Sequence, residues 1–284
     1  MAVQSLSYYK YSGIGNTFII VDAMSLDLPF STLVPQIITH CRTQNGTGAD
    51  GFIFARPSDC ADLQMLHFNA DGSVPEMCGN GIRCLAQFAY DRGIVTASQL
   101  SIETGAGIRD VYREKQNQIR VDMGVPIVTR EKIPMTGSPG TRVVNEPIQV
   151  GEHQVQITAV SMGNPHIVIF DQPLDDETVT RLGPALEVHD RFPNRINVEF
   201  VAVSSRKMAR VRVWERGVGE TNACGTGACA VLVAGVLTDR MDREATIVLP
   251  GGQLEIKWCE QSGHIRMTGP AIVCGTGTLL FEWD

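Results

Sequence analysis

The sequence lacks several features that would assign it to a common class of protein. No run of Lys and Arg occurs, and the formal net charge is -7 at pH 7 with a pI near 5.4. A chain without a basic patch cannot neutralise nucleic-acid phosphates, so we expect no nucleic-acid partner. No apolar run reaches the roughly 18 residues of a membrane span, and residues 1–13 do not resemble a signal peptide. The sequence therefore predicts a cytoplasmic protein that does not contact a membrane.

Motifs for metals and nucleotides are also missing. The eight cysteines include no Cys-x2-Cys pair and the six histidines are scattered, so we predict no metal site. Neither a Walker motif nor a complete G-x-G-x-x-G after a strand is present, and we predict no cofactor. In a reducing compartment most of the cysteines are expected to be structural thiols. We predict a structural role for six cysteines: Cys41, Cys60, Cys84, Cys229, Cys259 and Cys274.

Three segments of the chain recur in the same order at nearly the same spacing. "GNTFIIVD" resembles "GNPHIVIFD", "EMCGNGIRC" resembles "NACGTGAC", and "QIRVDMGVPIV" resembles "HIRMTGPAIV". The first pair is 148 residues apart and the other two pairs are 146 residues apart. This pattern indicates a duplicated unit, and 284 residues exceed the usual length of one domain. We predict two domains related by a pseudo-twofold axis and sharing a cleft, one of residues 1–123 plus 270–284 and the other of residues 124–269.

The predicted secondary structure is rich in strands. Short β-branched or alternating runs bounded by Gly, Pro, Asn and Asp, such as "TFIIVDA" and "ARVRVWE", are typical of strands. Each half also contains one clear helix, which begins just after a cysteine: one has an apolar face that includes Ile82 and Leu85, and the other, "ACAVLVAGVLTDR", is apolar nearly all round. We predict an α+β fold in which each domain is a mainly antiparallel sheet wrapped around a central helix.

Cys78 and Cys224 each precede a glycine-containing turn that opens a helix. The first N–H groups of a helix have no acceptor within it and bind anions, so each turn can hold a carboxylate. The same positive helix end favours a thiolate, which predicts a lowered pKa for both cysteines. Two such groups beside one carboxylate match a cofactor-independent racemase, in which one thiolate removes the α-proton and the opposed thiol supplies another. The residues of the two carboxylate-binding turns are Gly79, Asn80, Gly225 and Thr226.

The segments "FNADGSVPEMCGNGIRC" and "ERGVGETNACGTGACA" resemble the two signature segments of the diaminopimelate epimerase family. The resemblance extends over nearly the whole chain, because "GIGN", "GADG", "GNPH" and "RINVEF" occur in the family order. It implies an enzyme without pyridoxal phosphate that interconverts LL- and meso-diaminopimelate, a step toward lysine and peptidoglycan. It also implies a cytoplasmic homodimer with a small-molecule amino acid as substrate.

The resemblance also assigns roles to individual residues. Cys78 and Cys224 match the two acid/base cysteines, while His166 and Glu215 match auxiliary polar residues that set cysteine protonation and hold the substrate amine. Arg216 suits a bidentate contact with the distal carboxylate. The other positions that match substrate-binding residues are Asn16, Asn69, Asn164 and Asn197, together with the backbone of Gly79, Asn80, Gly225 and Thr226.

Three positions depart from the family pattern. Ser12 and Thr17 stand where an imidazole and a carboxylate are usual, and Gly51 stands where some members carry a glutamine near the substrate. These changes leave a racemase of broader or different specificity, such as a glutamate- or proline-type enzyme, as an alternative. A proton-shifting isomerase and a non-catalytic amino-acid-binding protein are further alternatives, although the paired cysteines argue against both.

Overall fold

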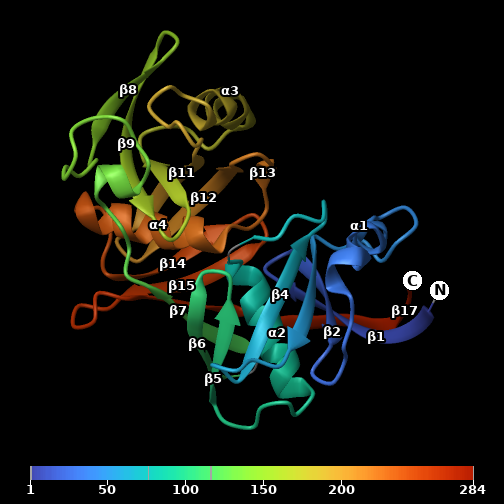
Figure 1. Cartoon of the computed structure of the whole chain (residues 1–284). Helices are drawn as coiled ribbons and strands as arrows, with labels where there is room; N and C mark the ends of the chain where they lie inside the picture. Colours follow the sequence, from blue (N-terminus) through green and yellow to red (C-terminus); the bar gives the residue numbers. More distant parts are fainter. Residues whose placement is uncertain (1, 76, 116, 284) are drawn as a thin grey trace. The chain divides into compact units, whose positions relative to one another are not determined.

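The chain divides into two compact units in the computed structural model, which describes residues 2–75, 77–115 and 117–283 (Figure 1). Unit 1 consists of Met1–Val121 and Gly269–Asp284, and unit 2 consists of Asp122–Thr268. The bounds expected from the sequence, 123/124 and 269/270, differ from these by two residues and one residue. None of the described helices has both the length and the apolar character needed to cross a bilayer.

Unit 1 contains a sheet with a helix on each face. Strand β1 pairs antiparallel with β2 and β17, β2 pairs parallel with β3, β3 antiparallel with β4, and β4 parallel with β5, while β5, β6 and β7 form an antiparallel series. The strands are β1 (Ala2–Gly13), β2 (Asn16–Asp22), β3 (Gly51–Arg56), β4 (Leu63–Asn69), β5 (Gln99–Thr104), β6 (Gly107–Arg113), β7 (Gln118–Gly124, which crosses into unit 2) and β17 (Ile272–Trp283). The helices are η1 (Phe30–Leu33), α1 (Val34–Cys41) and α2 (Gly79–Asp91).

Unit 2 repeats this order of pairings. Strands β8 and β9 pair antiparallel, as do β9 and β10; β10 then pairs parallel with β11, β11 antiparallel with β12, β12 parallel with β14, and β14, β15 and β16 form an antiparallel series. The strands are β8 (Glu146–Val150), β9 (His153–Ser161), β10 (Pro165–Ile169), β11 (Asn197–Ser205), β12 (Met208–Glu215), β13 (Gly219–Thr221), β14 (Glu244–Leu249), β15 (Gly252–Trp258) and β16 (Ile265–Pro270, which crosses into unit 1). The helices are η2 (Arg130–Lys132), α3 (Asp176–Glu187) and α4 (Gly225–Leu237).

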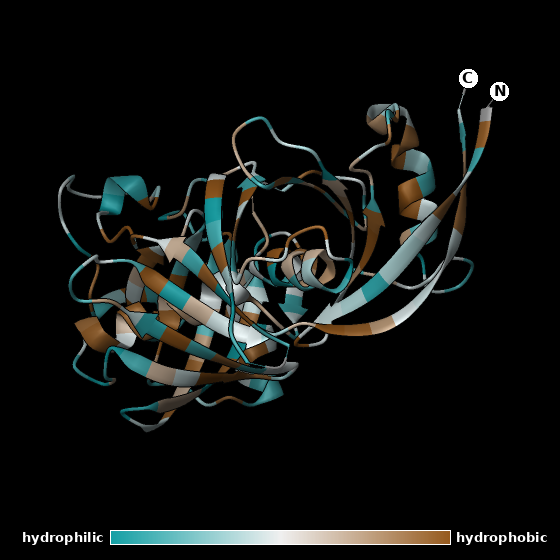
Figure 2. Ribbon diagram, turned by 90° about the horizontal axis from the view of Figure 1, so that it is seen from below, coloured by the Kyte–Doolittle hydropathy of each residue, from teal (hydrophilic) through white to brown (hydrophobic). Residues whose placement is uncertain are grey.

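Alternating side chains give each sheet two buried faces. In unit 1, Phe52 and Phe54 pack with α1, while Ile53 lies on the opposite face and approaches Gly81 of α2. In unit 2, Val198 and Phe200 pack with α3, which leaves the alternate residues of β11 on the α4 side. Bands of both polar and apolar colour along the strands show this alternation in Figure 2. A shift of one residue in register would exchange the two faces, so the hydrophobic pattern fixes the register.

The two helices that follow the cysteines lie against the sheets and are almost entirely buried. Helix α4 carries no charged residue and contacts β9, β10, β11, β14 and β15, whereas α2 also buries Arg83 and Gln87. The α+β fold predicted from the sequence is confirmed, with strands predominant and a central helix in each unit.

Candidate functional site

Cys224 occupies the N-cap position of α4 in an extended backbone conformation, with φ -126° and ψ 105°. Cys224 is only 5% exposed, and its Sγ lies 3.5 Å from Oγ1 of Thr226. Gly227 makes room for a close polar neighbour, because a Cβ atom at that position would lie 2.8 Å from Oε1 of Glu199 and 3.2 Å from Sγ of Cys224. The glycine thus allows a carboxylate to approach the first turn of the helix.

His166 and Glu199 form a buried pair on the neighbouring parallel strands β10 and β11. Nδ1 of His166 lies 2.7 Å from Oε1 of Glu199, and both side chains are completely buried. The other ring nitrogen, Nε2, lies 3.0 Å from Oδ1 of Asn164. The imidazole ring is therefore held in one orientation from both sides.

The same polar group includes the sulfur of Cys224. Donor atoms of His166, Glu199 and Cys224 lie within 4.8 Å of one another, and these are side chains that can ligate a transition metal. Oε1 of Glu199 is already engaged by His166. The cluster is equally able to move protons, since it brings an imidazole, a carboxylate and a thiol together away from water.

Burial and negative charge determine the protonation of Cys224. Burial raises the pKa of the Cys224 thiol well above its usual value of 9.0, and the carboxylates of Glu215 and Glu199 raise it further. The hydrogen bonds from Thr226 and the Gly227 amide act in the opposite direction but do not compensate. The lowered pKa predicted from the helix N-terminus is therefore wrong for Cys224, which holds its proton.

Glu215 closes β12 nine residues before Cys224. Burial raises the pKa of its carboxyl group, while a hydrogen bond from Oγ1 of Thr221 on β13 and the charge of His166 lower it. Glu215 is thus a shielded carboxyl group next to a thiol, which is the kind of neighbour predicted to influence cysteine protonation.

Asn197 is buried, and its amide is engaged by the backbone. Its Nδ2 donates to the carbonyl of Pro165 at 2.7 Å, and its Oδ1 accepts from the backbone N–H of Arg216 at 2.9 Å. The side chain of Arg216 is exposed and donates through Nη1 to the carbonyl of Asn194 at 3.2 Å. Asn197 therefore joins the start of β10 to the end of β12 and positions the loop that presents Arg216.

Cys78 occupies the equivalent N-cap position of α2 in unit 1, with φ -135° and ψ 110°. Its Sγ accepts a hydrogen bond from the Gly81 amide at 3.4 Å. Arg83, one turn further along the helix, is completely buried and donates from Nη1 to the Gly79 carbonyl and from Nη2 to Oδ1 of Asn80, each at 2.9 Å. A buried cation thus makes hydrogen bonds to the first turn of this helix.

The remaining predicted residues of unit 1 lie at the ends of strands. Asn16 is the first residue of β2, and Asn69 is the last residue of β4 and donates from Nδ2 to Oγ of Ser73 at 2.9 Å. Thr17, one of the departures from the family pattern, donates to Oδ2 of Asp50 from its hydroxyl and its backbone N–H. Of the predicted site residues, unit 1 contains Asn16, Asn69, Cys78, Gly79 and Asn80. Unit 2 contains Asn164, His166, Asn197, Glu215, Arg216, Cys224, Gly225 and Thr226.

Glu199 and Arg83 were not predicted as site residues from the sequence. Glu199 stands in the apolar run "NVEFVAV", and Arg83 stands in a helix whose other inward residues are mostly apolar. A charged residue inside an apolar pattern is a signal for a buried, paired charge, because an isolated buried charge is very unfavourable.

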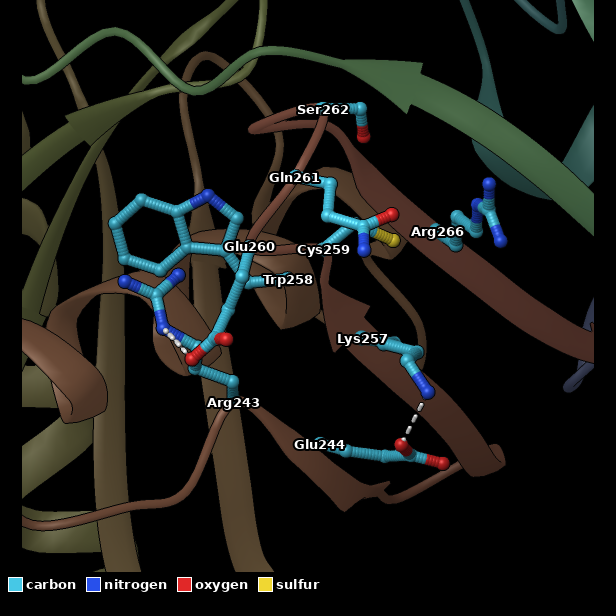
Figure 3. Close-up of a pocket in the computed structure, with 9 residues that line it drawn as sticks. All are labelled: Arg243, Glu244, Lys257, Trp258, Cys259, Glu260, Gln261, Ser262 and Arg266. Carbon is cyan, nitrogen blue, oxygen red and sulfur yellow. Dashed lines mark hydrogen bonds and ion pairs between the residues drawn. The ribbon is translucent and has the colours of Figure 1, made fainter.

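A separate hollow of about 440 Å³ lies near β14 and β15 in unit 2 (Figure 3). Four of its charged groups are paired locally: Lys257 contacts Glu244 at 2.7 Å, and Arg243 contacts Glu260 at 3.5 Å and stacks on the ring of Trp258. Neither cysteine of the two helix turns lines it, so we place no acid/base chemistry there.

Comparison with known proteins agrees with this geometry. The family profile described as diaminopimelate epimerase matches residues 8–129 and 158–278. The chain belongs to the diaminopimelate epimerase family. A diaminopimelate epimerase from Desulforudis audaxviator is 49% identical over 271 residues, which cover 94% of this chain and 96% of that protein. The corresponding protein from Moorella thermoacetica is 46% identical, with coverage of 94% and 96%.

Solved structures share the fold at low sequence identity. A hydroxyproline epimerase from Agrobacterium vitis with bound trans-4-hydroxy-L-proline has a TM-score of 0.70 at 13% identity, covering 99% of this chain and 92% of that one. A phenazine biosynthesis protein of the PhzF family from Bacillus anthracis has a TM-score of 0.67 at 16% identity, covering 98% and 100%. These neighbours support the fold assignment, and the sequence relatives support the family.

Proposed function

We propose that this chain interconverts LL- and meso-diaminopimelate without a cofactor, using Cys78 and Cys224 as the two proton-transfer groups. The observation that carries the proposal is that each of two units with the same strand order places a cysteine at the N-cap of its central helix. One such cysteine could have a structural role, whereas two equivalent ones match a reaction that needs two proton-transfer groups. The relatives at 45–49% identity are named diaminopimelate epimerase.

In the reaction, one cysteine acts on each face of the α-carbon. A thiolate takes the α-proton, so that the C–H bond breaks and an S–H bond forms. The thiol on the other face then gives its proton to the carbanion, so that its S–H bond breaks and a C–H bond of inverted configuration forms. No electron is gained or lost, and the reverse reaction exchanges the roles of the two sulfurs.

From the charged residues near the two cysteines, we assign a starting role to each thiol for one direction of the reaction. Cys224, beside Glu199 and Glu215, holds its proton and serves as the acid. Cys78 stands at a helix turn with the buried guanidinium of Arg83, and a cation there favours the thiolate that serves as the base. His166, fixed by Glu199, and Glu215 adjust the charge near Cys224 as proton transfer proceeds.

The carboxylate next to the reacting carbon is assigned to the helix N-termini. The backbone N–H groups of the first turns of α2 and α4, at Gly79, Asn80, Gly225 and Thr226, offer donors and a positive dipole end. As the proton leaves, negative charge moves onto that carboxylate, and fixed donors stabilise it. We assign Asn16, Asn69 and Asn164 to the other polar groups of the substrate and Arg216 to the distal carboxylate, with Asn197 holding the Arg216 loop in place.

The experiment follows solvent deuterium into the α-position of LL-diaminopimelate, with glutamate and proline as alternative substrates. We expect incorporation with formation of the meso isomer for diaminopimelate, and rates lower by orders of magnitude for the others, because they lack the distal groups. Absence of exchange with diaminopimelate would overturn the proposal. Exchange with proline or glutamate at a comparable rate would show a broader racemase.

We further propose that the enzyme is cytoplasmic, supplies meso-diaminopimelate for lysine and peptidoglycan synthesis, and forms a homodimer. The dimer is supported by β17, which pairs with β1 and exposes Ile272, Val273 and Leu280, each at least half accessible. Substitution Leu280→Arg should shift the molar mass measured by light scattering from that of a dimer toward 31.0 kDa. A monomeric wild type, or a dimer unaffected by the arginine and by the similar change Val273→Arg, would refute this interface.

A further inference from the structure

His67 is a buried histidine whose ring nitrogens are not hydrogen-bonded. The residue is 4% exposed, and neither Nδ1 nor Nε2 has a hydrogen-bond partner in the described part of the chain. Two unpaired polar atoms in one buried side chain are unfavourable, and native structures retain such atoms for a reason. His166 of unit 2 is equally buried but is paired at both nitrogens, which makes the state of His67 distinctive.

Burial keeps the His67 ring neutral. Loss of hydration lowers its pKa from 6.5 to about 4, and no carboxylate contributes to the shift. A neutral imidazole carries one N–H donor and one nitrogen lone pair that can accept. It can therefore accept a hydrogen bond from a cation without repelling it.

The ring of His67 is directed toward one end of the sheet. His67 pairs with Ile53 across β3 and β4, and the next pair on the same face of the sheet is Gly51 with Asn69. Nε2 of His67 lies only 2.7 Å from the point where a Cβ of residue 51 would stand. The ring thus fills the space above Gly51, on the same sheet face as Asn69, and any larger residue at 51 would displace it.

Asn16 presents a second unpaired atom at this end of the sheet. Its Oδ1 is buried and has no partner among the described residues. Asn16 shares a sheet face with Phe18, which pairs in register with Gly51 of β3. The Phe18 ring lies edge-on to the ring of His67, with 5.5 Å between the ring centroids. Two buried groups able to accept hydrogen bonds therefore lie on one face of the sheet, on strands β2 and β4, which both pair with β3.

The same face is covered by the helix of Cys78. A Cβ at Gly81 of α2 would contact Met65, Ile53 and Phe18, all of which lie on the His67 side of the sheet. Cys78 immediately precedes this helical turn. The unpaired acceptors consequently lie in the layer next to the proton-transfer cysteine of unit 1.

We propose that His67 is a substrate-binding residue of the epimerase, whose neutral ring accepts a hydrogen bond from an ammonium group of the bound amino acid together with Oδ1 of Asn16. The inference rests on the proposed function and adds a residue to that site. Gly51 contributes by leaving the space in which the ring lies. Binding of the substrate pairs atoms that the folded chain leaves unpaired.

The test compares His67→Leu, His67→Gln and the control Met65→Leu, which lies one position along the same face of β4. We expect His67→Leu to raise KM for LL-diaminopimelate roughly 10-fold or more, the effect of losing one hydrogen bond to a charged group, with kcat changed less. The glutamine carbonyl can accept the same bond, so His67→Gln should retain most of the affinity. Met65→Leu should leave KM unchanged.

Thermal unfolding of the substrate-free proteins provides the second readout. A leucine removes the unpaired polar atoms, so His67→Leu should melt at or above the temperature of the wild type while binding substrate more weakly. If the leucine variant fails to fold, His67→Phe retains the ring shape and answers the same question. An unchanged KM in the leucine or phenylalanine variant would overturn the role of His67.

The outcomes separate this inference from the proposed function. A wild type that exchanges no α-proton with diaminopimelate refutes the function itself. A wild type that epimerises with the same KM as its His67→Leu variant refutes only the binding role. Calorimetric titration of LL-diaminopimelate into Cys78→Ala, with and without His67→Leu, measures the affinity difference without turnover.

Discussion

The two cysteine-bearing helices occupy equivalent places in the two units but have different charged residues near their N-termini. Cys78 and Cys224 are both N-caps and lie nine residues after the last residue of a strand, Asn69 in β4 and Glu215 in β12. The buried Arg83 donates to the first turn of α2, whereas Glu199 and Glu215 raise the pKa of Cys224. The two units thus share one scaffold, and they differ in the charged residues of α2, β11 and β12.

The largest expected effect is loss of either sulfur. Cys78→Ala and Cys224→Ala should each lower the epimerisation rate by about 10³-fold or more, because a positioned acid or base contributes about 10²–10⁴-fold. Solvent deuterium incorporation measures this. Cys84→Ala, a buried cysteine in α2, serves as the control and should retain activity. Full epimerisation by either N-cap variant would show that the two helices do not share the reaction.

The next contrast is between His67, unpaired among the described residues, and the paired His166, and it concerns the stability of the fold. His67 has a pKa of about 4 when folded and 6.5 when unfolded, so the unfolded chain binds the proton first as pH falls. Stability should therefore rise with pH from about 4 to 6.5, by roughly 3 kcal/mol across this range. Urea unfolding of wild type and His67→Leu should show this difference in pH dependence. Parallel curves would mean that His67 is not buried and neutral.

Removing the negative charge of Glu199 should lower the pKa of Cys224 and so reduce the difference between the two thiols. In Glu199→Gln the pKa of Cys224 should fall, so the thiol is lost at lower pH and the alkaline decline of kcat/KM moves to lower pH. We expect roughly a 30-fold loss of kcat at neutral pH, within the usual range for one acid/base partner. Glu244→Gln, an exposed carboxylate on β14, is the control. An unshifted alkaline decline would exclude electrostatic control by Glu199.

The smallest expected effect comes from the charge in the other unit. Arg83→Met should lower activity at pH 7 by roughly 10-fold and move the acidic decline of kcat/KM to higher pH, because the thiolate loses a nearby cation. Arg83→Lys keeps the charge and should keep the position of that decline. If both variants show the same profile, the role of Arg83 is limited to its hydrogen bonds with Gly79 and Asn80.

Much of the fold could be predicted because the amino-acid sequence contains a visible internal repeat. The 146-residue spacing of the two cysteine turns indicated a duplicated unit, and the strand pairings then proved to follow one order in both units. Alternation of apolar residues identified the strands, and the uninterrupted apolar run after Cys224 identified a buried helix.

The electrostatics could not be predicted in the same way. Helix position alone suggested a lowered pKa for Cys224, but Glu199 comes from β11 and lies 25 residues away in sequence. Its effect depends on packing against Gly227, which no local pattern reveals. Likewise, the alternating sequence of β4 predicts that His67 lies on a buried face, but it cannot show that the ring nitrogens lack hydrogen-bond partners among the described residues.

The pairing of β1 with β17 has a consequence for biosynthesis. Residues as far apart as Ala2 and Trp283 are neighbours in this ladder, and Phe281 belongs to the core of unit 1. On the ribosome, the N-terminal part of unit 1 emerges first, yet it must wait for the last strand before its core is complete. Unit 2 is one continuous stretch and can finish earlier. Unit 1 is therefore the half of the molecule most exposed to chaperones and proteases during translation.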